Sequence, residues 1–167
     1  MKIGFLEKVR KDRAVRRSRT LGYSAVELDR IERLYNITIT GDFRDFMLEI
    51  GRCSGGLMSD ESIILYRNAW DIRTQLLTQF VFFNDLQDAG LYNLLQPQPF
   101  LFSIERETRY YFLFTGGFNP DSVFCYDEST KMLTETGLTF LEYIQALVRA
   151  NNLEMSDVIC QGELVRL

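Results

Sequence analysis

The sequence predicts a single α+β domain, with helices flanking a mostly antiparallel sheet, and two patterns predict this class. Helical periodicity dominates the first half of the chain and returns over residues 139–150. Between these regions, residues 100–126 hold aromatic-rich segments that are typical of strands. Helices followed by neighbouring strands favour an α+β arrangement over a parallel sheet with alternating helices. At 167 residues, 46% of them hydrophobic, the chain is long enough for one folded domain.

The segment 24–35 has the pattern of an amphipathic helix with its own N-terminal cap. Ser24 and Glu27 have the spacing of a capping box, in which each side chain bonds the backbone of the other residue. The apolar residues that recur at helical spacing are Ala25, Leu28, Ile31 and Leu34. We expect this stripe to face the core and the charged residues, Glu27 included, to face solvent.

A second helix is predicted over 41–50. Ile37 and Ile39 alternate with threonines, which predicts a short extended link before it. Thr40 is suited to cap the helix, and Gly51 to end it in a left-handed turn. The apolar stripe of this helix consists of Phe43, Phe46, Met47 and Ile50.

The middle of the chain predicts a loop over 52–61, a short strand over 62–66 and a third helix that Asn68 caps. The apolar stripe assigned to this helix is Ala69, Ile72, Leu76, Phe80 and Phe83. A further helical turn or two is expected through 86–95, and Pro97 and Pro99 end it, because proline breaks a helix.

The second half of the chain predicts strands and a closing helix. The strands are expected at 100–104, 109–114 and 123–126. The polar stretch 127–137 is expected to connect them to the helix, where Thr139 and Glu142 repeat the capping-box spacing. An edge strand is expected over 163–166.

Residue types limit the chemistry. The chain has no histidine, which excludes a Ser-His-Asp or Cys-His enzyme. Its three cysteines are far apart and form no CxxC, so we expect reduced thiols and no zinc site. No glycine-rich phosphate motif is present. We therefore expect no enzymatic activity, no cofactor and no metal.

The lack of long apolar runs predicts the compartment of the protein, and the distribution of charge predicts the kind of partner. No apolar run approaches the length of a membrane span, and the first 20 residues lack the apolar core of a secretion signal, so we expect a cytoplasmic protein. Residues 1–20 hold eight basic and two acidic side chains, which predicts a basic N-terminal arm or helix ahead of a domain over 21–167. The remainder holds 11 basic and 21 acidic side chains. Such an acidic body would attract a basic protein and repel nucleic acid.

The two predicted N-terminal helices and their link share a motif with a known protein family. The residues of this motif are Glu32, Ile37, Ile39, Asp42, Phe43, Arg44, Phe46, Leu48 and Gly51. In this order they resemble the opening motif of the SUKH superfamily, which groups bacterial toxin-immunity proteins with yeast cell-wall-assembly regulators. The family usually has a proline where this chain has Thr40, although threonine can also cap a helix.

The resemblance implies an immunity protein that binds a cognate bacterial toxin, often a nuclease, and blocks it sterically. The acidic body predicts that this toxin is basic. Two alternatives stay open: a regulatory scaffold of the cell-wall-regulator type, and a less favoured nucleic-acid-associated protein that uses the basic arm. The sequence leaves the oligomeric state open.

Candidate partner-binding residues are acids near loops and two aromatic anchors. The acids are Asp60, Glu61, Glu105, Glu107, Asp121, Asp127 and Glu128. The anchors are Trp70 and Phe118, because exposed aromatic side chains commonly contribute most to an interface.

Overall fold

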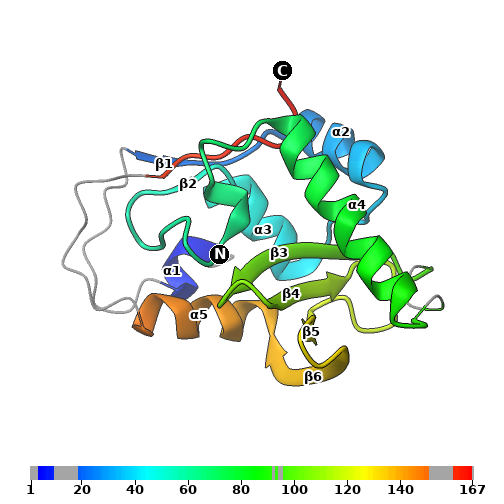
Figure 1. The fold of residues 1–167 in the computed structure, drawn as a ribbon. Coiled ribbons are helices and arrows are strands. Elements are labelled where there is room, and N and C mark those ends of the chain that lie inside the picture. Colours follow the sequence, from blue (N-terminus) through cyan, green and yellow to red (C-terminus); the bar gives the residue numbers. More distant parts are fainter. Residues whose placement is uncertain (1–3, 10–18, 92, 94–95, 151–159, 167) are drawn as a thin grey trace.

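A computed structural model describes residues 4–9, 19–91, 93, 96–150 and 160–166. These residues form five α-helices and two antiparallel sheets, which confirms the predicted α+β class (Figure 1). The helices are α1 (Phe5–Val9), α2 (Ala25–Tyr35), α3 (Gly41–Ile50), the 3₁₀ helix η2 (Ile64–Tyr66), α4 (Ile72–Asp88) and α5 (Phe140–Ala150). The strands are β1 (Thr20–Leu21), β2 (Cys53–Ser54), β3 (Pro99–Glu105), β4 (Arg109–Phe114), β5 (Ser122–Asp127) and β6 (Met132–Thr139).

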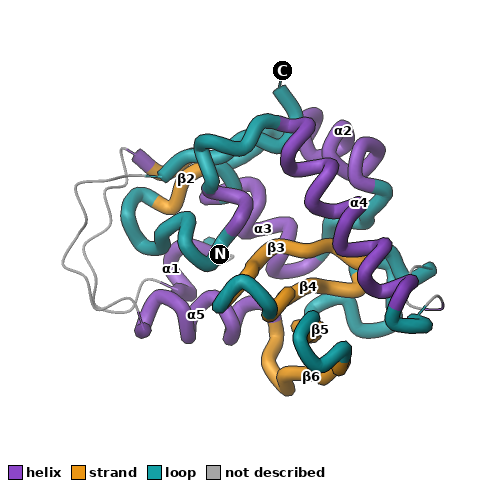
Figure 2. Tube along the Cα trace, viewed as in Figure 1, coloured by secondary structure: helices purple, strands orange, loops and turns teal. Residues whose placement is uncertain are grey.

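The larger sheet has the strand order β3-β4-β5-β6, so each strand pairs with its neighbour in sequence. Phe82 of α4 packs on Phe112 with ring centroids 4.9 Å apart, whereas Tyr143 of α5 lies 5.0 Å from Tyr111. Because neighbouring residues of a strand point to opposite faces, α4 and α5 cover opposite faces of this sheet. The ribbon and the tube show the same layering, with α4 above the sheet and α5 below it (Figures 1 and 2).

An aromatic cluster joins α3 to α1 and α5. Phe46 is fully buried and lies 5.5 Å from Phe5 and 5.1 Å from Phe140, measured between ring centroids. Phe43 packs against Phe100 of the sheet. The predicted burial of the α3 stripe is therefore confirmed. Most of the predicted basic arm, residues 10–18, lies outside the described residues.

The capping box of α2 is confirmed, since the Glu27 amide donates to Ser24 Oγ and the Ser24 amide donates to Glu27 Oε2. The prediction for α2 needs three corrections. Ala25, which was expected in the buried stripe, is exposed at the start of the helix. Leu34 is 44% exposed, and its neighbour Tyr35 is buried in its place. Glu27 is buried rather than exposed, because two arginines described below hold its carboxylate.

Helix α3 has the predicted bounds, but its end differs from the prediction. Gly51 has φ −60°, an ordinary right-handed value, so it does not form a left-handed turn. A Cβ on Gly51 would lie 2.7 Å from the carbonyl oxygen of Met47, so the glycine is required by lack of space. The left-handed residues in this region are Asn36, at the end of α2, and Gly41, at the start of α3.

The segment 62–66 is not the predicted strand. Only Ile63 forms an isolated bridge, to Ser103, and the next three residues form η2. The Gln75 side chain donates to the Ile64 carbonyl oxygen at 2.9 Å, which satisfies a backbone group that a strand partner would otherwise hold.

Helix α4 begins after Asp71, not after Asn68, and its buried side differs from the predicted stripe. Asp71 Oδ1 accepts a hydrogen bond from the Thr74 amide. The buried residues are Ile72, Gln75, Gln79, Phe82 and Leu86. Phe80, which was expected in the core, is 60% exposed. The Gln79 amide group bonds both backbone groups of Leu101, so a polar residue occupies the inward position.

The C-terminal third confirms one prediction and corrects two. The capping box of α5 is confirmed, since Glu142 Oε2 accepts from the Thr139 amide and Thr139 Oγ1 accepts from the Glu142 amide. The polar stretch after β5 forms the strand β6, which had been expected as a connection. Residues 163–166 form no strand. Instead, the Gly162 amide bonds the Arg52 carbonyl oxygen. Among the described residues, no helix is long and apolar enough to span a membrane.

Candidate functional site

The turns that follow β3 and β5 lie side by side at one end of the larger sheet. Glu105 faces Arg109 in the strand register, and Arg109 faces Asp127. The Glu128 amide donates to the Thr108 carbonyl oxygen at 2.9 Å, which ties the two turns together. Four of the predicted acids therefore converge here. We call them the acidic sheet end: Glu105, Glu107, Asp127 and Glu128.

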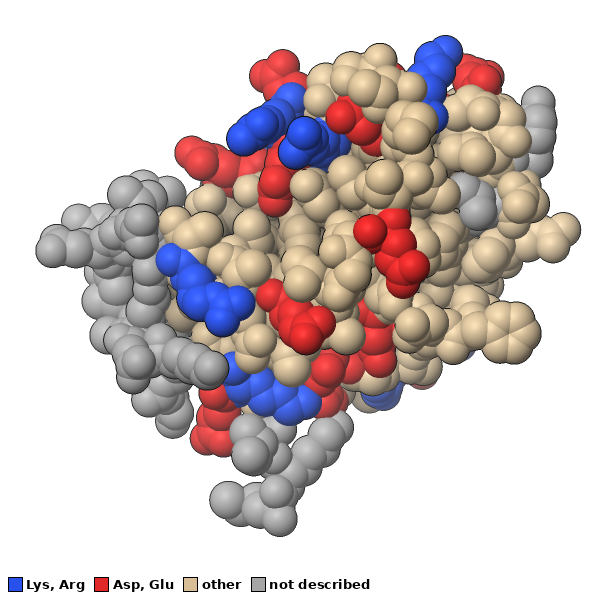
Figure 3. Space-filling model, turned by 90° about the horizontal axis from the view of Figure 1, so that it is seen from below, with Lys and Arg blue, Asp and Glu red and all other residues tan. Residues whose placement is uncertain are grey.

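An open hollow of about 360 Å³ lies beside the acidic sheet end. It occupies the part of the α5-facing side of strands β4 to β6 that α5 leaves uncovered. We call it the sheet groove; its lining residues are Arg109, Tyr111, Cys125, Asp127, Thr130, Met132, Thr134 and Thr136. On the face of the molecule seen from below, acidic side chains are spread with basic ones among them (Figure 3).

Hydrogen bonds hold one acid of the groove in its ionised form. Asp127 Oδ1 accepts from the amide and the hydroxyl group of Ser129, and these bonds keep the pKa of Asp127 below its usual value. Its Oδ2 lies 3.8 Å from Arg109 Nε. The carboxylate is therefore charged at neutral pH, and it forms part of the groove wall.

The groove also holds a thiol and a phenol, and both are neutral at pH 7. Burial raises the pKa of the Cys125 thiol, and burial raises the pKa of Tyr111 to about 12. A thiol acts as a nucleophile only as its thiolate, and a phenol acts as a base only when it is deprotonated. These side chains can donate and accept hydrogen bonds, but they are not activated for covalent chemistry.

Helix α5 positions Glu105. The Tyr143 hydroxyl donates to Glu105 Oε1 at 2.8 Å and lies 2.8 Å from Ser103 Oγ. The buried Ser103 and Tyr143 thus fix the direction of a carboxylate at the surface. A carboxylate held in this way loses less conformational entropy when a partner binds.

The turn between β3 and β4 has an unfavourable backbone. Arg106 and Glu107 have φ values of 52° and 61°, in the left-handed region that glycine and asparagine favour. Both side chains are exposed. Two consecutive charged residues in this conformation make the turn less stable than a glycine-containing turn would be.

Asp85 and Asp88 of α4 extend the acidic sheet end, and the sequence analysis had not predicted that they would lie there. The Tyr110 hydroxyl donates to Glu128 Oε2 at 2.9 Å. Burial, followed by the charges of Glu128 and Asp88, raises the pKa of Asp85. These acids are distant in sequence from the turns, and no local pattern could have placed them together.

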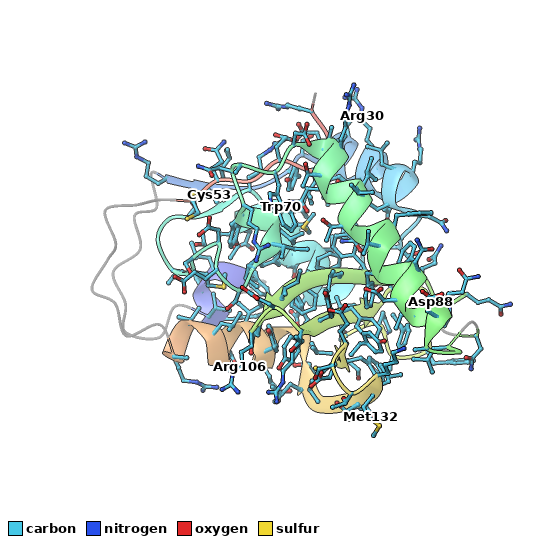
Figure 4. All side chains as sticks on the ribbon, viewed as in Figure 1. Arg30, Cys53, Trp70, Asp88, Arg106 and Met132 are labelled. Carbon is cyan, nitrogen blue, oxygen red and sulfur yellow. The ribbon has the colours of Figure 1, made fainter. Side chains whose placement is uncertain are left out.

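The remaining predicted residues lie elsewhere. Trp70 is half-buried, and the Arg67 guanidinium group stacks 4.5 Å above its ring. Arg67 also donates to the backbone carbonyl oxygens of Asp60 and Glu61, so these three predicted residues form a separate group. Figure 4 shows Trp70 and Asp88 toward opposite ends of α4.

The last two predicted residues lie beyond the other end of β4. Phe118 is fully exposed, in the connection from β4 to β5. Asp121 is half-buried, and burial together with the charge of Asp42 raises its pKa. Neither residue contributes to the acidic sheet end.

A second charged cluster runs from the buried Arg52 and Glu27 out to the exposed Arg166, and it was not expected from the sequence. Arg52 donates to both carboxylate oxygens of Glu27 and also to Glu163, and Arg166 donates to Glu27 Oε1 at 2.8 Å. The Arg52 guanidinium group lies 4.1 Å from the centroid of the Tyr23 ring. Arg52 and Glu27 are buried and fully engaged with one another, so this cluster is structural.

The chain matches no protein-family model and shows no significant match to a curated protein or to a solved structure. In the part of the chain that the structure describes, no group of three or more acidic or cysteine side chains is arranged to hold a metal ion.

Proposed function

We propose that this protein is a non-catalytic immunity protein of the SUKH type, which binds a basic bacterial toxin in the cytoplasm and blocks it. The toxin would dock on the acidic sheet end and reach into the sheet groove. One observation carries the proposal: four acids from two separate turns converge at one end of the sheet, and one of them, Asp127, lines the open groove beside them.

The charge of the rim suits recognition of a basic surface. Glu107 and Glu128 are exposed, while Glu105 and Asp127 are held by hydrogen bonds from neighbouring residues. Arg106 and Arg109 lie among these acids, so the negative charge is in excess but not alone. An excess of negative charge steers a basic partner and raises its association rate. Inside the groove, Met132 is 59% exposed and offers an adaptable apolar contact.

The strained turn is a second argument. Arg106 and Glu107 keep charged side chains at positions where glycine would stabilise the fold. A sequence that accepts this cost at an exposed turn is consistent with binding at that turn. The protonated Cys125 and Tyr111 support binding in the groove and argue against turnover.

The test uses the toxin encoded beside the gene for this protein and measures association by stopped-flow. The double variant Glu107→Gln, Glu128→Gln should slow association roughly tenfold at low salt, and raising the salt should shrink that difference. The matched control, Glu7→Gln with Asp29→Asn, removes the same amount of charge from exposed positions on α1 and α2. It should change the association rate less than about twofold.

Three results would contradict the proposal. An association rate that is insensitive to salt and to the Glu107 and Glu128 changes would place the toxin elsewhere. Binding without protection of toxin-producing cells would favour the regulatory scaffold. A shift of DNA or RNA that disappears when residues 1–18 are removed would favour the nucleic-acid alternative.

A further inference from the structure

Helix α4 has an exposed apolar side that packs against no described part of the chain. Leu77 and Phe80 are each 60% exposed, and Val81 is 48% exposed. No charged residue occurs between Arg73 and Asp85. The buried side of the helix lies opposite, so the exposed apolar residues are not part of the core. Figure 1 shows α4 on the outside of the molecule along its length.

These residues belong to one stripe. At 100° per residue, the positions that share the exposed side within a span of about 100° are Arg73, Leu77, Phe80, Val81, Asn84 and Asp88. Arg73, Asn84 and Asp88 are exposed, like the apolar residues between them. The stripe therefore has an apolar centre, a cation at its start and an anion at its end. We call it the α4 stripe.

The charges at the ends of the α4 stripe oppose the helix dipole. Acids are favourable near a helix N-terminus and cations near a C-terminus. Beyond its capping residue Asp71, α4 has no acid in its first turn and no cation in its last turn. Arg73 instead lies at the positive end, and Asp85 and Asp88 lie at the negative end. This placement is unfavourable in a helix that stands alone.

We propose that the α4 stripe is the interface of a symmetric homodimer in which α4 packs antiparallel to α4 of a second copy. A two-fold axis between Phe80 and Val81 places Phe80 opposite Val81 of the partner copy and Leu77 opposite Asn84. The same axis places Arg73 opposite Asp88, at both ends of the pair. One symmetry operation thus matches Phe80 with Val81 and cation with anion, while Leu77 faces the polar Asn84.

The pairing also removes the conflict with the dipole. The positive start of one helix comes to lie beside the acidic end of the other, where Asp85 and Asp88 are close to Glu128. Because a helix of this length spans only about 25 Å, the interface is modest in area, and we expect a dimer that dissociates in the micromolar range. The sheet groove is on the opposite face of the sheet, so it stays open in the dimer. The inference does not depend on the proposed function.

Sedimentation velocity over a range from about 5 to 500 μM tests the dimer on the full chain. The wild-type protein should shift from monomer to dimer within this range. Phe80→Glu should abolish the shift and leave the circular dichroism spectrum unchanged, because Phe80 is exposed. Val26→Glu is the matched control: it makes the same kind of change at a residue of α2 that is 62% exposed, and the dimer should persist.

A charge-exchange series tests the register. Arg73→Asp and Asp88→Arg should each weaken the dimer about tenfold, because each leaves like charges facing one another at both ends. The double variant Arg73→Asp, Asp88→Arg restores both pairs and should recover wild-type affinity. A wild-type protein that stays monomeric, a dimer that survives Phe80→Glu, or a double variant no tighter than the single ones would each overturn the proposal. Binding of a different protein to the stripe of a persistent monomer would do the same.

Discussion

The guanidinium group of Arg52 donates to both carboxylate oxygens of Glu27, at 3.0 and 3.1 Å, and both side chains are buried. Glu27 also accepts from the Ser24 amide and from Arg166, and Arg52 also donates to Glu163. The carboxylate of one early helix is thus held by cations from two distant parts of the chain. Each of these bonds is charge-assisted, which makes it stronger than a neutral hydrogen bond.

Replacing Glu27 by glutamine should lower the free energy of unfolding by about 3–5 kcal/mol, because the buried Arg52 then has only the partly exposed carboxylate of Glu163 as counter-charge. Glutamine keeps the size of the side chain, so packing is little changed. Urea denaturation at neutral pH measures the effect. Glu61→Gln, at an exposed position, should cost less than about 0.5 kcal/mol. A loss below about 1 kcal/mol for Glu27→Gln would show that the pair is not a major source of stability.

Stability should also depend on pH through Glu27. The hydrogen bonds from Arg52, followed by that from the Ser24 amide, hold the pKa of Glu27 well below its usual value. A folded-state pKa below the unfolded value gives stability that is present above the unfolded pKa, near 4.3, and is lost as the pH falls toward the folded pKa. Denaturation midpoints should therefore decrease as the pH falls from about 5, and less steeply in Glu27→Gln. Equal slopes for the two proteins would exclude Glu27 as the titrating group.

Phe46 and Phe80 should respond differently to the same substitution. Phe46→Ala removes a fully buried ring that contacts other aromatic rings, and it should cost about 3–5 kcal/mol. Phe80→Ala removes a ring that is 60% exposed, and the monomer should lose less than about 1 kcal/mol. Chemical denaturation at low protein concentration separates the two. Similar losses would mean that the assignment of the α4 faces is wrong.

Glu107→Gly should stabilise the fold and weaken binding. Glycine adopts the φ of 61° without steric cost, so we expect a gain of about 0.5–1 kcal/mol in the free energy of unfolding. The lost carboxylate should slow toxin association, as Glu107→Gln does without any gain in stability. Thermal melts and association rates of the two variants can be compared directly. If glycine destabilised the turn, the argument from backbone strain would fail.

The local parts of the fold could be predicted from the sequence. Capping at Ser24 and Thr139 depends on residues three positions away, and both capping boxes are present. The bounds of α3 were predicted from its apolar stripe, although Thr40 makes no side-chain capping bond and Gly51 forms no left-handed turn. Strands β3 to β5 are rich in aromatic residues, and the structure places strands at all three predicted segments.

The incorrect predictions have a common cause: each concerns a feature that contacts between distant parts of the chain determine. Gln79 faces inward since its side chain bonds the backbone of β3, which no helical pattern can reveal. Strand β6 is mostly exposed on an edge, so it lacks the alternation by which a strand is recognised. The acids of the acidic sheet end were predicted from the sequence, as exposed acids near loops. The groove was not, because it requires the pairing of β5 with β6.

The ion cluster also determines when the domain can become complete during synthesis. Arg166 lies 139 positions after Glu27, so a ribosome adding about 5–20 residues per second makes the second residue roughly 7–28 s after the first. Throughout that time the Glu27 carboxylate of α2 lacks the hydrogen bonds from Arg166 that it has in the folded domain. A fragment that stops before Gly162 lacks Glu163, Leu164 and Arg166, so it leaves the ion cluster incomplete and the core without a fully buried leucine.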